Sequence, residues 1–314
     1  MLAVAAALSG PVTATADTWH LEKGRQWKPL SAEGKDKFLL AVAEAKKLVN
    51  AGQTKAARKA FDALKKEFPE IAGPDLDLFI KAEIYYCKGK FSSALRSYEK
   101  LLRKHPESEL RQAALDRQFA IATAYLAGQK RTLLGIFKIK GYAEGIRIME
   151  KITDPDRAGF DTPLGMKAAV ATAEAREQRQ EFNEAYLKWW EISLEWETGP
   201  VAKDALLGMA RCKRAVYNRH PEHKRPLYDA SNLRTARSNY ERYKLLYPED
   251  AEEIGVDEII EEINEQLALK QLTVGQYYET IGNEASARLY YEMVVSDWPG
   301  SKAAETAREM LGRN

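Results

Sequence analysis

The sequence has few cysteines, no excess of either charge and none of the common catalytic motifs. Its two cysteines, Cys87 and Cys212, are too few in a chain of 314 residues for a small domain held together by disulfides. No spacing typical of metal ligands accompanies them, and each lies within a helix-like stretch. Both thiols are therefore expected to be buried and inert, and neither a metal nor a cofactor is predicted.

The charge is balanced, because 48 lysines and arginines stand against 46 aspartates and glutamates and give a formal net charge of +2. No global basic excess indicates a nucleic-acid-binding protein. Hydrophobic residues make up 45% of the chain, and the mean hydropathy is −0.48. This composition excludes both an intrinsically disordered chain and a polytopic membrane protein.

No glycine-rich phosphate loop, GxSxG nucleophile motif or HExxH zinc motif is present. His220 and His223 form a close histidine pair, but the proline between them argues against a helix that would bring both rings to one metal. A wall-cleaving enzyme would need a positioned acid, for which Glu174, Glu177 and Glu191 are candidates without an obvious partner carboxylate. We therefore predict no enzymatic activity.

Residues 1–16, MLAVAAALSGPVTATA, contain no charge and end in a small-x-small pattern typical of signal peptidase sites. About 15 residues are too few to cross a bilayer as a permanent helix. We expect a secretory leader whose removal leaves a protein beginning near Asp17, and an alanine-rich tail is the alternative. Residues 17–33 then form an extended N-terminal arm, in which Trp19 and Trp27 are expected to dock on the first repeat or on a partner.

A small residue followed four positions later by a large one, called the knob below, recurs six times along the chain. The pairs are Ala57 with Phe61, Ala94 with Tyr98, Gly145 with Met149, Ala185 with Trp189, Ala236 with Tyr240, and Ala287 with Tyr291. Residues four apart share one face of a helix, and the copies are separated by at least the 34 residues of a tetratricopeptide repeat. Small residues let two helices approach closely, while the knob fills the space between one helix pair and the next. Trp190, beside the knob Trp189, is likewise expected to pack in the core.

Glycine and proline mark the ends of the expected helices. Three first helices have a small residue seven positions before a glycine: Ala45 before Gly52, Ala82 before Gly89, and Gly275 before Gly282. Glycine readily takes the left-handed conformation that ends a helix. The prolines expected to stop second helices are Pro69, Pro106, Pro248 and Pro299. Because one pair cannot bury its own apolar face, the pairs must stack.

The sequence thus predicts an all-α fold, a tetratricopeptide-like superhelix of helix pairs with about six repeats and long-helix insertions. Extra segments are expected at 129–140 and 218–231, and the first helix of the last repeat is expected to be lengthened. Turn-forming residues at 153–163, TDPDRAGFDTP, indicate an internal boundary. Repeats 1–3 then occupy residues 34–157, and repeats 4–6 occupy residues 158–314.

Charge is concentrated locally in the C-terminal half. The bases between residues 211 and 225 are Arg211, Lys213, Arg214, Arg219, Lys224 and Arg225, against the single acid Glu222. After Pro248, nine acids from Glu249 to Glu265 precede the next base. Opposed patches of this kind can orient a partner or a neighbouring repeat, and two solvated faces are the alternative.

Two C-terminal segments resemble the repeats of the BamD/YfiO family of outer-membrane assembly lipoproteins. They are LYDASNLRTARSNYERYKLLYPED, in which an insertion precedes a helix, and LALKQLTVGQYYETIGNEASARLYYEMVVSDWPGSKAAETAREML. The resemblance covers most of residues 34–312 in architecture and is specific from about residue 227 onward. It implies a non-catalytic subunit whose N-terminal repeats receive a terminal segment of an unfolded client, while its C-terminal repeats hold the barrel-bearing partner.

The resemblance implies protein partners, either the β-barrel assembly machinery or unfolded outer-membrane clients, and a location in the periplasm at the outer membrane. No nucleic acid is expected among the partners, and any membrane association would run through partner proteins. Family members carry an acylated cysteine at the mature N-terminus, whereas no cysteine precedes Cys87 here, so a lipid anchor is not expected. The ending YYEMVVSDWPGSKAAETA is also similar to periplasmic repeat proteins of the Tol-Pal and cell-wall coordinator type, which are the alternative.

Partner-binding residues are expected on the first helices, which line the concave side of such a stack. The candidates in the N-terminal repeats are Tyr85, Arg111, Arg117 and Tyr125. In the C-terminal half, the basic cluster supplies two further candidates, Arg214 and Arg219.

Overall fold

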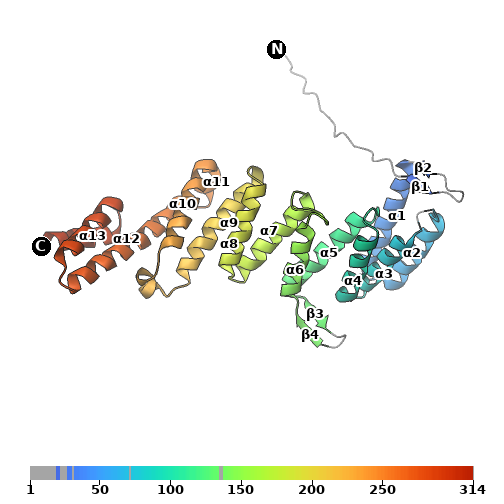
Figure 1. The fold of residues 1–314 in the computed structure, drawn as a ribbon, viewed down its shortest axis with the longest axis horizontal. Coiled ribbons are helices and arrows are strands. Elements are labelled where there is room, and N and C mark those ends of the chain that lie inside the picture. Colours follow the sequence, from blue (N-terminus) through green and yellow to red (C-terminus); the bar gives the residue numbers. More distant parts are fainter. Residues whose placement is uncertain (1–18, 22–26, 30–31, 71, 134–136, 314) are drawn as a thin grey trace, which may run out of the picture. The chain divides into compact units, whose positions relative to one another are not determined.

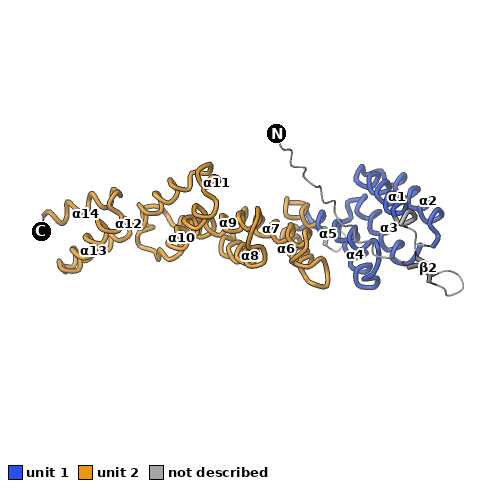
Figure 2. Tube along the Cα trace, turned by 90° about the horizontal axis from the view of Figure 1, so that it is seen from above, with its two compact units in different colours: residues 1–121, 130–140 blue, residues 122–129, 141–314 orange. Residues whose placement is uncertain are grey.

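The computed structural model describes residues 19–21, 27–29, 32–70, 72–133 and 137–313, so the expected leader at 1–16 lies outside the described residues. The chain forms two compact units, coloured separately in Figure 2. Unit 1 contains residues 1–121 and 130–140, and unit 2 contains residues 122–129 and 141–314. Among the described residues, every helix is too short or too polar to span a lipid bilayer.

Unit 1 is built from helices with two short antiparallel hairpins (Figure 1). Its helices are α1 (Ala32–Asn50), α2 (Thr54–Glu67), α3 (Pro74–Cys87), α4 (Phe91–Lys104) and α5 (Arg111–Leu126), whose last turn belongs to unit 2. The hairpins are β1 (Trp19–Leu21) with β2 (Trp27–Pro29), and β3 (Lys130–Leu133) with β4 (Phe137–Lys140). The first hairpin falls in the expected arm. The side chains of Trp19 and Trp27 lie outside the described part of the structure, so their docking stays a prediction.

Unit 2 continues the helix pairs. Its elements are α6 (Tyr142–Thr153), α7 (Pro163–Gln178), α8 (Phe182–Glu195), α9 (Gly199–Asn218), the 3₁₀ helix η1 (Glu222–Leu227), α10 (Ser231–Leu246), α11 (Pro248–Glu253), α12 (Val256–Thr280), α13 (Glu284–Asp297) and α14 (Lys302–Arg313). The helix pairs are α1/α2 and α3/α4 in unit 1, and α7/α8, α9/α10 and α12/α13 in unit 2. In unit 2, Gly145 of α6 also lies against Leu126 in the last turn of α5. The predicted all-α, tetratricopeptide-like fold with about six repeats is therefore confirmed.

The knobs occupy the core as predicted. All six small residues and all six knobs are buried, one pair on each of α2, α4, α6, α8, α10 and α13. In unit 1, the knobs Phe61 and Tyr98 both lie edge-on to Phe79 of α3, with ring centroids 6.5 and 6.2 Å away. Edge-to-face contacts of this kind add to the stabilisation from burial alone. The knob of α2 thus fills the space between the first helix pair and the second.

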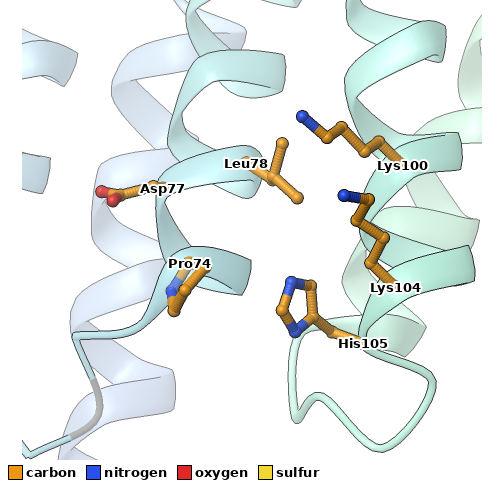
Figure 3. Close-up of a pocket in the computed structure, with 6 residues that line it drawn as sticks. All are labelled: Pro74, Asp77, Leu78, Lys100, Lys104 and His105. Carbon is orange, nitrogen blue, oxygen red and sulfur yellow. The ribbon is translucent and has the colours of Figure 1, made fainter.

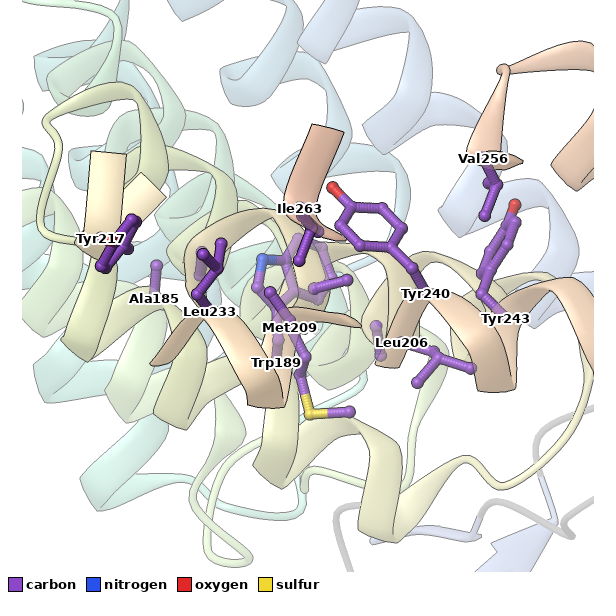
Figure 4. Packing of buried hydrophobic residues seen from close by; sticks show 14 of the residues in the cluster. Ala185, Trp189, Leu206, Met209, Tyr217, Leu233, Tyr240, Tyr243, Val256 and Ile263 are labelled. Atoms are coloured by element: carbon purple, nitrogen blue, oxygen red, sulfur yellow. The ribbon is translucent and has the colours of Figure 1, made fainter. Parts of the chain in front are cut away.

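The larger core of unit 2 is centred on Trp189 of α8 and extends through α9 and α10 to α12 (Figure 4). Trp189 lies against Gly208 of α9, where an added Cβ would come within 2.5 Å of the indole. A Cβ added at Gly275 of α12 would likewise lie 2.6 Å from the ring of the knob Tyr291. The expectation that Trp190 is buried is wrong, because its side chain is 48% exposed. One step along a helix turns the side chain about 100° away from the knob's face.

Glycine ends the first helices as predicted. Gly52, Gly89 and Gly282 have φ angles of 70°, 66° and 76°, and Gly128 after α5 has φ of 99°. After α7, the corresponding left-handed residue is Gln180, with φ of 61°. A residue with a Cβ adopts this conformation at a cost of about 1–2 kcal/mol. The end of α7 therefore keeps the left-handed turn of the repeat with glutamine in place of glycine.

Proline stops the second helices of four repeats. Pro69, Pro106 and Pro299 follow the ends of α2, α4 and α13, and Pro248 follows α10 and begins α11. The residue before each proline is aromatic, with φ between −122° and −136° and ψ between 60° and 64°: Phe68, His105, Tyr247 and Trp298. Proline disfavours the helical conformation in the residue before it, so each of these helices ends two residues before the proline.

Two expected features of the layout differ in the structure. The extra segment at 129–140 contains the β3–β4 hairpin, because Phe137 and Ile139 alternate with lysines in the period of a strand. The segment at 153–163 is expected to be a boundary, but it joins α6 and α7 within unit 2. Its turn packs tightly, since a Cβ at Gly165 would lie 1.8 Å from the Gly159 carbonyl oxygen. The lengthened first helix of the last repeat is confirmed as α12, with 25 residues.

Candidate partner-binding site

In three repeats the knob carries a polar group that hydrogen-bonds a glutamate on the first helix of the same pair. The Tyr98 hydroxyl donates to Glu83 at 2.6 Å, and the Tyr291 hydroxyl donates to Glu279 at 2.8 Å. The Trp189 indole N–H donates to Glu177. These knob–glutamate bonds link the two helices of a pair through their polar atoms, and the repeat pattern of the sequence does not predict them.

Glu83 is also the centre of a buried ion pair in unit 1. Arg117 of α5 donates from Nε to Oε1 at 2.9 Å and from Nη2 to Oε2 at 2.8 Å. Its Nη1 donates to Oδ1 of Asn50 on α1 at 2.6 Å, and its guanidinium lies 4.4 Å from the centre of the Tyr86 ring. Arg117 therefore ties together α1, α3 and α5.

The network shifts the protonation of its members. Burial, followed by the charge of Glu83, raises the pKa of Tyr98 well above its ordinary value. Burial acts to lower the pKa of Arg117, but hydrogen bonding to Glu83 and the charge of Glu83 outweigh it and raise that pKa. Burial and the neighbouring Arg117 lower the pKa of Lys46 on α1. The phenol is thus held neutral and the guanidinium charged, as the hydrogen bonds require.

The structure does not bring the four N-terminal candidates together on a surface. Arg117 is 6% exposed and fully engaged in the ion pair, and Tyr125 is buried in unit 2. Tyr85 and Arg111 are half-buried in unit 1. Arg117 is enclosed by its contacts with α1 and α3, and Tyr125 lies against Gly141 at the start of α6. Of these four candidates, Tyr85 and Arg111 keep exposed surface that a partner could contact.

The basic and acidic patches of unit 2 are joined to each other. Arg214 pairs with Glu262 of α12, and Glu265 accepts hydrogen bonds from the N–H groups of Lys302 and Ala303 at the start of α14. The Arg214–Glu262 pair connects α9 to α12, and Glu265 connects α12 to α14. That the patches orient a partner stays a prediction. Arg219 is exposed and lies 6.0 Å from the ring of Phe182.

The acids considered for catalysis have structural neighbours. Glu177 bridges Trp189 and Arg211, the latter at 3.1 Å, and Glu191 pairs with Lys188. Partial desolvation by neighbouring groups, followed by the charge of the nearby Asp204, raises the pKa of Glu174. No arrangement of two carboxylates flanking a closed cleft is formed by these three described residues.

The histidine pair of the η1 loop also has a structural role. The ring of His220 stacks on that of Tyr228, with centroids 3.6 Å apart and planes 11° from parallel. The part of the chain that the structure describes contains no cluster of three or more histidine, cysteine or acidic side chains suited to a metal.

A cleft of about 590 Å³ opens between the start of α3 and the end of α4 in unit 1 (Figure 3). Its lining residues come from both helices of one pair: Pro74, Asp77, Leu78, Lys100, Lys104 and His105. Figure 3 shows Lys100, Lys104 and His105 along the α4 side, facing Leu78, while the Asp77 carboxylate points away from them. The α3/α4 pair thus presents basic groups beside an apolar wall.

The acids near this cleft have partners of their own. Asp77 pairs with Lys65 of α2 at 2.6 Å, and Asp75 accepts a hydrogen bond from the Ser108 hydroxyl at 2.6 Å. Within the described ranges, Lys100 and Lys104 have no ion pair and no hydrogen-bond acceptor. In the sequence this site appears only as two lysines four residues apart on one helix. They do not stand out there, because the charged residues between 211 and 265 form a much larger cluster.

The α3/α4 pair also carries the match to a known family. Residues 78–108 match the sequence profile described as a tetratricopeptide repeat. The chain is of the tetratricopeptide-repeat type. No curated protein sequence matches it.

Two solved structures are similar to the chain. The C-terminal part of a TPR repeat-containing protein from Cytophaga hutchinsonii has 16% identity and a TM-score of 0.40, and the match covers 88% of this chain and 93% of that one. PilW, described as a widely conserved type IV pilus biogenesis factor, has 15% identity and a TM-score of 0.31, with coverage of 86% and 97%.

Proposed function

We propose that the protein is a non-catalytic scaffold of the cell envelope that binds segments of partner proteins during outer-membrane β-barrel assembly. The observation that carries this proposal is the resemblance of the segments that form α10 and α12–α14 to the repeats of BamD/YfiO proteins. Stacked helix pairs of the tetratricopeptide type support the scaffold part, because they offer extended surfaces to peptide or helical segments. Tyr85 and Arg111 in unit 1, and Arg219 in unit 2, are the expected contacts that stay accessible.

The location is part of the same proposal. Residues 1–16 act as a secretory leader, and the protein works in the periplasm at the outer membrane through its partners. N-terminal sequencing of protein from the envelope fraction is expected to begin near Asp17. An intact Met1 in protein recovered from the cytosol would contradict both the location and the role in outer-membrane assembly.

The binding partner is tested by cross-linking in intact cells followed by purification of a C-terminally tagged chain. We expect a subunit of the β-barrel assembly machinery or an outer-membrane client, identified by mass spectrometry and absent from an untagged control. Recovery of cell-wall synthesis or Tol-Pal factors alone would favour the coordinator alternative. Release of soluble fragments from purified peptidoglycan by the protein would contradict the non-catalytic part.

A further inference from the structure

We infer that the cleft between α3 and α4, lined by Lys100, Lys104, Leu78 and Pro74, binds an acidic segment of a partner protein. The inference rests on the proposed scaffold function and names the chemistry of one partner segment. Glutamate or aspartate side chains would pair with the two lysines, and an apolar side chain of the same segment would cover Leu78 and Pro74.

The charge of the cleft favours an anionic occupant. Lys100 and Lys104 lie one turn apart on α4, both are exposed, and neither has a partner among the described residues. Like charges at this spacing destabilise a helix, and a bound carboxylate relieves that repulsion. Asp77, the acid that lines the cleft, is already paired with Lys65, and its carboxylate faces away from Lys100 and Lys104 (Figure 3).

The two helix ends beside the cleft have opposite effects on an anionic occupant. The negative C-terminal end of α4 disfavours an anion, and the positive N-terminal end of α3 favours one. Lys104 lies in the last turn of α4, where a cation is favoured by the helix dipole whether or not a ligand is present. Lys100 lies a turn further inside, where that effect has faded. The start of α3, at Pro74, contributes the positive end of its dipole. Stabilisation of its own helix end is enough to explain Lys104 but does not explain Lys100. A contribution of Lys100 to ligand binding would therefore indicate a binding site.

The apolar wall favours a peptide over a small anion. Leu78 is half-buried, and Pro74 is exposed at the first position of α3. The cleft has a volume of about 590 Å³ and is open to solvent, so it offers a surface to a segment of chain lying across it rather than a closed pocket for a small molecule. A free phosphate ion would occupy a small part of this volume and would leave the wall uncovered. An acidic segment with one apolar side chain uses both features of the cleft.

The test uses the full chain and a fluorescein-labelled peptide of about 12 residues, with glutamates at alternate positions around a central leucine. A peptide with glutamine in place of each glutamate is the control ligand. We expect the acidic peptide to bind about tenfold or more tightly than the neutral one, with the preference falling as salt rises. Lys100→Gln with Lys104→Gln is expected to weaken binding of the acidic peptide about tenfold, and Lys100→Gln alone to weaken it measurably.

The matched control is Lys55→Gln with Lys59→Gln, which removes the same charge from exposed positions on α2 outside the cleft. Its affinity is expected to equal that of the unmodified chain, and circular dichroism checks that all variants are folded. Equal effects of the two double substitutions would overturn the inference, as would binding of phosphatidylglycerol vesicles or inorganic phosphate without binding of the acidic peptide.

The scaffold function fails separately from this inference. If Lys100→Gln with Lys104→Gln leaves the yield of the cross-linked envelope partner unchanged, the cleft does not bind that partner and the scaffold function stands. If the unmodified chain is cross-linked to no protein, the scaffold function is contradicted, whatever peptides the cleft accepts in solution.

Discussion

Glu83 carries a carboxylate in the buried interior of unit 1, where a charge without partners would be strongly destabilising. Tyr98 and Arg117 together supply three hydrogen bonds to its two oxygens. Such an ion pair adds little net stability over apolar residues of the same size, but loss of one member leaves the other charge unpaired. Arg117 therefore has a structural role as the cation that pairs with Glu83.

Arg117→Met is expected to lower the free energy of unfolding by about 3–5 kcal/mol, because Glu83 then stays buried without its cation. Glu83→Leu combined with Arg117→Met removes both charges and should recover much of the loss, although the Tyr98 hydroxyl then lacks its acceptor. Urea unfolding followed by circular dichroism measures both variants. If Arg117→Met left stability unchanged but abolished partner binding, Arg117 would be a partner contact and not a structural residue.

At the scale of the element, the first helices α1, α3, α5 and α12 end in a left-handed turn at glycine, and α7 does so with Gln180 in place of glycine. Only α9 differs among these described helices, because Arg219 at its end has φ of −63°. Gly89 shows what the turn requires, because a Cβ added there meets no atom within 4 Å. Any cost of a side chain at this position therefore arises from the backbone conformation and not from crowding.

Gln180→Gly is expected to stabilise the protein by about 0.5–1 kcal/mol, because glycine adopts the positive φ without strain while losing more entropy on folding. Gly89→Ala is the reverse change and is expected to destabilise by about 1 kcal/mol. Thermal unfolding of the two single variants gives the comparison. A lower melting temperature for Gln180→Gly would show that its side chain, and not the backbone, determines this helix end.

The helix pairs could be predicted because close packing leaves a direct mark on the sequence, such as Ala94 four residues before Tyr98. The partners of those knobs could not, since Arg117 meets Glu83 from a helix 34 residues further along the chain. No local pattern records which polar groups face each other across three helices. The β3–β4 hairpin is not predicted either, although Phe137 and Ile139 alternate with lysines, because it interrupts an otherwise helical period.

At the scale of the whole molecule, both units hold tyrosines whose hydroxyl protons are bound more tightly in the folded state. Burial is the leading cause of a raised pKa at Tyr98, Tyr142, Tyr217, Tyr240, Tyr243 and Tyr291. The value for Tyr291 rises from 10.0 to about 12. Burial likewise raises the pKa of the Cys212 thiol from 9.0 to about 12.

Stability is therefore expected to fall on the alkaline side. A group whose pKa is raised by folding contributes fully below its unfolded value and loses that contribution as pH rises through the folded value. The urea midpoint should stay level up to pH about 9, fall first through Cys212, and fall more steeply above pH about 10 as the tyrosines titrate. Cys212→Ala should remove the earliest part of the fall, with Cys87→Ala as the control. A level midpoint up to pH 12 would contradict this assignment.

The knob–glutamate bonds affect how the chain avoids misfolded states in which helices of different repeats pair with each other. Six pairs share one pattern of small residue and knob, so a first helix could in principle dock on the second helix of a wrong repeat. Glu83 meets a donor at Tyr98, but it would meet none at the knobs Phe61 or Met149. A misplaced pair would thus bury a carboxylate opposite a hydrocarbon, at a cost of several kilocalories per mole. The buried Glu83 therefore disfavours pairing of α3 with a second helix whose knob is Phe61 or Met149.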